Sequence, residues 1–198
     1  MMTGNLRVPS MVLLALTTSI GCGHKNVKDE NPYTPERVAS VMKDLKYHKV
    51  IVRPISLDKG LEEDDGEKRE KATADCQAAT LDFLSQKKIF SSVQVSPDAP
   101  GDADTLVVQT SVQALRIVGG GARFWAGAFA GSSHMTLLVV AKDSSGTTVG
   151  QRAVSNENNA VGAAWTFGAS DRGLPGDMGQ LVADSIIRLA QTQQGAGK

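Results

Sequence analysis

The sequence predicts an α+β domain: a mostly antiparallel sheet of about five strands with helices packed on one face, preceded by a cleaved signal peptide. Strand patterns are grouped in one block, helical patterns flank that block, and the chain opens with a short apolar run. A continuous parallel α/β fold would need strands and helices to alternate throughout, and they do not. The 198 residues, of which 41% are apolar and 21% charged, suit one globular domain with extra segments.

The first segment is an apolar run from Val8 to Ile20, preceded by a single cation, Arg7. A helix needs about 20 apolar residues to cross a bilayer, so this run is too short to stay in place as a membrane span. Its length is that of the apolar region of a secretory signal. Residues 1–21 are therefore predicted to form a signal peptide that is removed.

A cysteine follows a small residue at the end of this run, in the order Ser19-Ile20-Gly21-Cys22. The stretch resembles the lipobox of bacterial lipoproteins, although Ser19 stands where the usual pattern has Leu. The resemblance implies cleavage before Cys22 and attachment of a diacylglycerol to its thiol. Gly23, in place of an Asp, implies the outer membrane, with the domain facing the periplasm. The alternatives are a plain signal peptide or a buried helix, with a coincidental cysteine.

Behind Cys22 the chain is predicted to comprise a lipidated tether, a single α+β domain and a frayed tail, at residues 22–34, 35–191 and 192–198. The tether is polar, which lets the domain stand off the lipid surface. The domain opens with a helix to about Lys46, because Thr34 suits the N-cap and Pro35 the first helical position.

Periodicity predicts the remaining elements of the domain. A continuous apolar run indicates an inner strand over 49–54, and helical spacing indicates a long helix over 66–88. Cys76 lies on the apolar stripe of that helix and is interpreted as an inert core thiol. Further strand patterns lie at residues 93–95, 106–117, 135–141 and 147–155. The apolar phase changes at Leu115, which indicates either a bulge or a strand that is buried on both faces near its end. Asp177 is the expected N-cap of a last helix.

Two segments, Gly119–Gly131 and Ala160–Ala169, break this periodicity by mixing small residues with aromatic ones. They supply the candidate contact residues Arg123, Phe124, Trp125, Phe129, Trp165 and Phe167. Three interpretations stay open. The aromatic side chains pack against the sheet, they anchor another protein, or they touch a membrane over Ala122–Ala130, a length that suits one spanning strand of about 9–11 residues.

The patterns of common enzymes and cofactor sites are missing. Zero formal net charge disfavours a nucleic-acid partner, and none of the three histidines sits in a metal-ligand spacing. The glycine-rich segment lacks the Lys of a phosphate-binding loop, and Gly168–Gly173 departs from the nucleophile elbow by one position. The acidic run Glu62–Asp65 lacks the ligand spacing of an EF-hand. The chain is therefore predicted to be non-catalytic, without cofactor or metal.

One stretch of the chain resembles a known family. Gly119-Gly120-Gly121-Ala122-Arg123 between two strand patterns, together with Gly127, Gly131 and the Asp143-x-x-Gly146 turn, is similar to the bacterial lipoproteins that carry domain of unknown function 4410. The resemblance extends from about Lys49 to Ala190, and its most specific part is Gly119–Gly150. It implies a fold and a location, and no activity.

These observations lead to one expected function and one alternative. The expected protein is a lipid-anchored, non-catalytic component of the cell envelope, held on the outer membrane through the Cys22 lipid. Its glycine and aromatic loops would contact another envelope protein, because exposed aromatic side chains are frequent interface anchors. The alternative is a lipoprotein that binds a small apolar ligand or lipid between the sheet and these loops.

Overall fold

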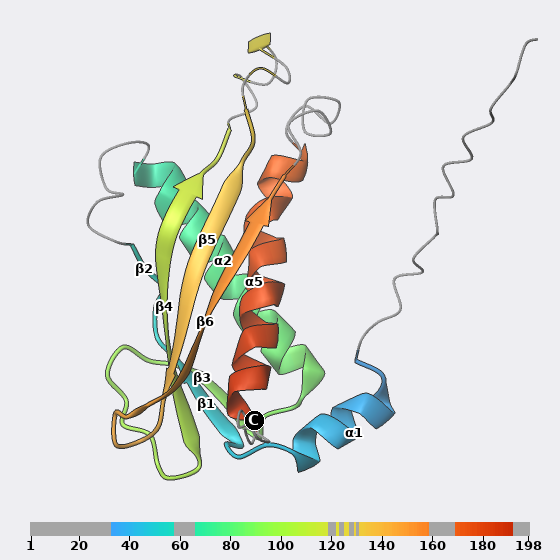
Figure 1. Cartoon of the computed structure of the whole chain (residues 1–198), viewed down its shortest axis with the longest axis vertical. Coiled ribbons are helices and arrows are strands. Elements are labelled where there is room, and N and C mark those ends of the chain that lie inside the picture. Colours follow the sequence, from blue (N-terminus) through green and yellow to red (C-terminus); the bar gives the residue numbers. More distant parts are fainter. Residues whose placement is uncertain are drawn as a thin grey trace, which may run out of the picture. The chain divides into compact units, whose positions relative to one another are not determined.

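The computed structural model describes residues 33–57, 66–118, 122, 125–126, 129, 131–158 and 169–191, with the backbone alone at 66–67 and 169–172. All of them belong to the compact unit Pro32–Lys198. Its elements, in chain order, are α1 (Pro35–Lys43), β1 (Lys49–Val52), β2 (Ser56–Leu57), α2 (Gly66–Lys87), β3 (Ser92–Val95), β4 (Thr105–Arg116), β5 (His134–Lys142), β6 (Thr148–Glu157) and α5 (Ala169–Ala190) (Figure 1). The expected signal peptide, most of the tether, the acidic run and the tail lie outside the described residues.

The strands form one mixed sheet in the order β3-β1-β4-β5-β6, with β2 beside β4. The predicted α+β class is confirmed, and β4, β5 and β6 pair antiparallel as an up-and-down series. The sequence patterns did not predict that β1 pairs parallel with both β3 and β4, or that β2 pairs parallel with β4. The helix α2 carries the chain from β1 back to β3, which is the long crossover that parallel neighbours require.

The pairing of β4 with β5 contains the irregularity that the apolar pattern predicted. The register shifts between Val112 and Ala114, so a bulge changes which face each later residue occupies. The β5–β6 hairpin closes through Asp143, whose Oδ1 accepts hydrogen bonds from the backbone N–H of Ser145 (2.9 Å) and Thr147 (3.0 Å). Gly146 adopts φ +85°, a conformation that favours glycine.

Helices α2 and α5 pack side by side on one face of the sheet, as the sequence predicted (Figure 1). Every second residue of β5 points into this layer and is fully buried: Met135, Leu137, Val139 and Ala141. The facing residues of α5 include Met178, Val182 and Ile186, which are equally buried. This two-layer arrangement encloses one contiguous apolar core.

The two long helices approach closely at Gly179 of α5. A Cβ atom at this position would come within 2.5 Å of the Ala79 Cβ and 2.8 Å of the Cys76 carbonyl oxygen. Thr80 supports the same contact, because its hydroxyl donates to the Cys76 carbonyl at 2.8 Å and lies 3.2 Å from the Gly179 carbonyl. Only a residue without a side chain allows α2 and α5 to meet at this distance.

Two helix boundaries differ from the expected ones. The N-terminal helix α1 has Thr34 as N-cap, as predicted, and ends at Lys43 with Asp44 as C-cap. The last helix begins at Ala169 and not at Asp177, and it contains Pro175. The sequence favoured the later boundary because Asp177 and Gln180 resemble a capping box. No helix in the described part of the chain is long and apolar enough to span a membrane.

Candidate functional site

The loop between β4 and β5, residues 119–131, carries the most exposed apolar side chains of the described residues; we call it the contact loop. Trp125 is 86% exposed and Phe129 is 99% exposed. Ala122 and Ala126 are exposed beside them. This exposure contradicts the interpretation in which these two rings pack against the sheet.

The base of the contact loop is anchored on the sheet. The backbone N–H of Val118 donates to the hydroxyl of Ser133 at 2.9 Å, and both residues are buried. Gly131 has φ +86°, and a Cβ there would lie 3.1 Å from the Arg116 guanidinium. A larger residue at 131 would therefore have a strained backbone, and the Arg116 side chain would have to shift to make room for it. The strands thus hold the two ends of the loop in place, while Trp125 and Phe129 are exposed on it.

Only part of the predicted site can be followed in the structure. Trp125 and Phe129 lie on the contact loop and both are exposed. The other contact candidates, Arg123, Phe124, Trp165 and Phe167, lie outside the described residues, as does the predicted lipidation site Cys22.

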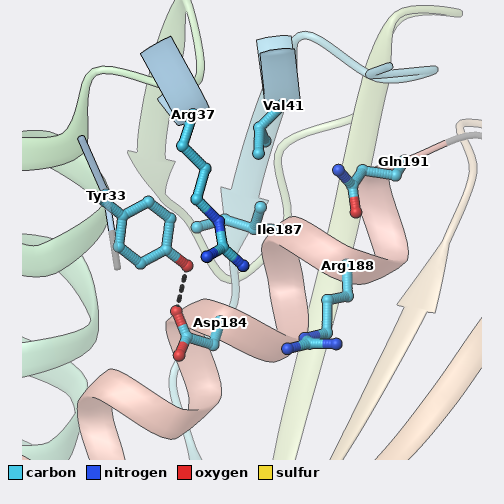
Figure 2. A pocket seen from close by; sticks show the side chains of 7 residues that line it. All are labelled: Tyr33, Arg37, Val41, Asp184, Ile187, Arg188 and Gln191. Carbon is cyan, nitrogen blue, oxygen red and sulfur yellow. Dashed lines mark hydrogen bonds between the residues drawn. The ribbon is translucent and has the colours of Figure 1, made fainter. Parts of the chain in front are cut away.

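A second feature, which the sequence did not predict, is a pocket of about 180 Å³ between α1 and α5. We call it the α1–α5 pocket; it is lined by Tyr33, Arg37, Val41, Asp184, Ile187, Arg188 and Gln191 (Figure 2). The tyrosine hydroxyl donates a hydrogen bond to the Asp184 carboxylate, which joins residues 151 positions apart. The sequence contains one signal for a charged site here: Asp184 and Arg188 lie one helical turn apart on the last helix, beside its apolar stripe.

Tyr33 is fixed in this pocket by three neighbours. Its ring meets the ring of Phe83 edge to face, with centroids 5.5 Å apart, and the Lys87 ammonium lies 4.9 Å from the centre of the Tyr33 ring. Burial, and after it the hydrogen bond to Asp184, raises the pKa of Tyr33 well above its usual range. The phenol therefore stays protonated and donates to Asp184 at any physiological pH.

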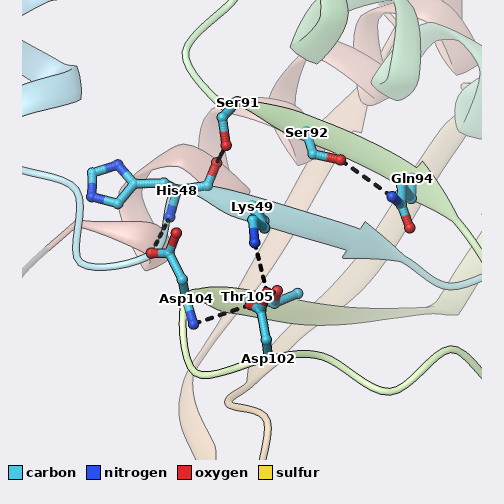
Figure 3. A network of polar contacts seen from close by, with 8 residues as sticks. All are labelled: His48, Lys49, Ser91, Ser92, Gln94, Asp102, Asp104 and Thr105. Atoms are coloured by element: carbon cyan, nitrogen blue, oxygen red, sulfur yellow. Dashed lines mark hydrogen bonds and ion pairs between the residues drawn. The ribbon is translucent and has the colours of Figure 1, made fainter.

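A polar network joins β1 to the segment that leads into β4 (Figure 3). Lys49 Nζ lies 2.6 Å from Asp102 Oδ2, and Thr105 Oγ1 lies 2.5 Å from Asp102 Oδ1. The hydrogen bond from Lys49, followed by that from Thr105, lowers the pKa of Asp102 to about 2. The backbone N–H of His48 donates to Asp104 Oδ1 at 3.2 Å. These groups satisfy one another, so the network serves to hold β1 against β4.

Two further findings concern the thiol and possible metal ligands of the described residues. Cys76 is fully buried, as predicted, and burial raises the pKa of its thiol to about 12. Among the residues that the structure describes, no group of three His, Cys, Asp or Glu side chains could hold a metal ion.

The fold and the two sites define an α+β domain that presents an exposed aromatic loop and a cationic pocket. No protein-family profile matches the sequence, and no curated protein matches it. Two structures of the PelC dodecamer from Paraburkholderia phytofirmans, one of them a single-residue variant, are similar at a TM-score of 0.45 with 16% and 15% identity. The similarity covers 74% of this chain and 90% and 89% of theirs. An uncharacterised protein is similar at a TM-score of 0.38 and 10% identity, over 71% of this chain and 93% of that one.

Proposed function

We propose that this chain is a lipid-anchored, non-catalytic protein of the cell envelope that contacts another envelope protein through its contact loop. Cys22 carries the acyl chains, and the outer membrane is the surface that they enter. The exposure of Trp125 and Phe129 on a loop with an anchored base is the observation that carries the proposal. Large aromatic side chains contribute much of the binding energy of protein interfaces when a partner buries them.

The arrangement of the domain favours a protein partner over the membrane that holds the anchor. The contact loop lies at one end of the sheet, and α1 lies at the opposite end (Figure 1). The lipidated tether would join the domain at Tyr33, which precedes α1. The 12 residues of β4 span about 40 Å between the two ends. A domain held at its α1 end therefore directs Trp125 and Phe129 away from the acyl chains.

We further propose that the chain belongs with the bacterial lipoproteins that carry domain of unknown function 4410. The support is the order of elements in the stretch that resembles this family. There β4 is followed by a glycine-rich loop, by β5 and by a turn closed by Asp143 and Gly146. The proposal of a non-catalytic role is supported by the sequence, in which the common catalytic patterns are missing.

Cross-linking in intact cells tests the contact loop. A photo-reactive amino acid replaces the exposed Ala126, with and without the double substitution Trp125→Ser and Phe129→Ser. We expect a protein adduct that the double variant loses, because each aromatic anchor contributes about 2 kcal/mol to such an interface, or about 30-fold in affinity. Circular dichroism and the melting temperature should stay unchanged, since both side chains are exposed.

The matched control is Val95→Ser, which removes an apolar side chain that is 50% exposed on β3. This variant should keep the adduct. An adduct with lipid in place of protein would show that the loop contacts a membrane, and it would overturn the proposal. Absence of any adduct in the unsubstituted protein would overturn it as well.

A further inference from the structure

The α1–α5 pocket brings two guanidinium groups to one opening from different elements. Arg37 extends from α1 and Arg188 from α5, and both guanidinium groups lie on the same side of the Tyr33–Asp184 pair in the view of Figure 2. Both arginines are exposed at the surface. We propose that Arg37 and Arg188 clamp the phosphate group of an anionic lipid headgroup.

The pocket carries more positive charge than its own residues neutralise. Within the described part of the chain, neither guanidinium has a hydrogen-bond or ion-pair partner. The one carboxylate among the lining residues belongs to Asp184, and it already accepts the hydrogen bond of Tyr33. Two guanidinium groups against one carboxylate attract an anion.

The chemistry of the pocket suits a phosphate better than a carboxylate or a neutral group. Each guanidinium can donate two parallel hydrogen bonds to an oxyanion, and a phosphate offers enough oxygen atoms to engage both arginines. A volume of about 180 Å³ accommodates a phosphate with part of a glycerol. Val41 and Ile187 supply apolar contacts at the same opening, which suits the carbon atoms of a headgroup.

The position of the pocket points to the membrane as the source of the phosphate. Tyr33, at its edge, lies 11 residues beyond Cys22, so an extended tether reaches about 35–40 Å. This choice of source rests on the proposed lipid anchor. The clamp itself does not, because it is built from residues of the folded domain. Failure of one proposal is therefore distinguishable from failure of the other.

Calorimetric titration of the full chain in nonionic detergent tests the clamp. The three probes are inorganic phosphate, short-chain phosphatidylglycerol and short-chain phosphatidylcholine, whose choline neutralises the phosphate. We expect the phosphatidylglycerol to bind more tightly than the phosphatidylcholine. Each of Arg37→Gln and Arg188→Gln should weaken that binding about fivefold, and the double variant about 25-fold. Added salt should weaken it further.

Two further variants distinguish binding at the two arginines from general electrostatic attraction to the protein surface. Arg152→Gln removes an exposed cation on β6, and it should leave the affinity unchanged. The double variant Arg37→Lys and Arg188→Lys keeps both charges but loses the paired donors, so its affinity should stay below that of the original chain.

Several results would overturn the proposal. One is an unchanged affinity in the Gln double variant with its circular dichroism spectrum intact, and another is full affinity in the Lys double variant. Binding of inorganic phosphate without binding of the lipid would identify a free phosphate as the ligand and overturn the choice of a headgroup. If none of the three probes binds the original chain, the pocket is not a phosphate-binding site.

Discussion

At the scale of single residues, Cys76 shows how burial decides the chemistry of a thiol. Its side chain is fully enclosed between α2, α5 and the sheet, and burial raises its pKa to about 12. The thiolate is the reactive form of cysteine, so a thiol with this pKa is inert at neutral pH. The hydrogen-bond contact with Thr80 lowers the pKa only in part.

Thiol labelling checks this inertness. In a Cys22→Ala variant Cys76 is the only thiol of the chain. At pH 8 a pKa of about 12 leaves about one thiolate in ten thousand, against about one in ten for the usual cysteine pKa of 9.0. We expect an aromatic disulfide reagent to label the folded protein at less than about 1% of its rate with the chain unfolded in urea. Rapid labelling of the folded protein would contradict the assignment of Cys76 to the core.

Some residues were predictable from the sequence because their roles are local. Thr34 caps α1 by accepting a hydrogen bond from the backbone N–H of Arg37, three residues further on. Cys76 lies one helical turn after Ala72 on the same buried stripe of α2. The Tyr33–Asp184 pair was not predictable, because its partners are 151 positions apart and no periodic pattern links them.

At the scale of elements, the contact between α2 and α5 depends on the absence of a side chain at Gly179. Ala79 and the backbone of Cys76 occupy the space that a Cβ would need. Backbone atoms cannot move aside without shifting the helix, so any larger residue would separate the two helices.

Gly179→Ala tests this close contact. We expect the free energy of unfolding to fall by about 1–3 kcal/mol, because overpacking outweighs the gain in helix propensity. The matched control is Gly176→Ala on the same helix, where nothing lies within 4 Å of the added Cβ. That variant should be stabilised by up to about 1 kcal/mol. Urea denaturation measures both values, and equal effects of the two substitutions would contradict the role of Gly179.

The elements that could be predicted are those whose pattern depends on their own residues. Alternation identified β4, a strong strand pattern identified β5, and the turn at Asp143–Gly146 identified β6 as its hairpin partner. The phase change indicated the bulge that the structure shows after Val112. The parallel neighbours of β1 could not be predicted. A continuous apolar run indicates that a strand lies inside the sheet, but it does not indicate which strands lie on either side of it. The first turns of α5 were missed because Asp177 and Gln180 form a local capping pattern, whereas the helix continues through it and begins at Ala169.

At the scale of the whole molecule, the two sites lie at opposite ends of the domain. The contact loop follows the last residue of β4, whereas the α1–α5 pocket lies where the tether would enter (Figure 1). Of the predicted contact residues, the structure places Trp125 and Phe129 on the surface. The pocket could not be predicted, because it forms only when α1 packs on α5.

Palmitate labelling tests the lipid anchor that the proposed function requires. We expect the unsubstituted chain to incorporate radiolabelled palmitate and to fractionate with the outer membrane, because Cys22 would be acylated. Cys22→Ala should lose both the label and the membrane fraction, while Cys76→Ala keeps both because its thiol is buried. A soluble, unlabelled product of the original chain would contradict the anchor.

The parallel pairing of β1 has a consequence for how the chain reaches its final state. β1 lies between β3 and β4, and His48 contacts Asp104, 56 positions further on. Closing a loop of this length costs chain entropy before any contact is gained, and such topologies fold slowly. A chain delivered from its N-terminus must therefore wait with β1 and α2 incompletely covered until β4 arrives. During that interval its apolar segments are exposed to aggregation.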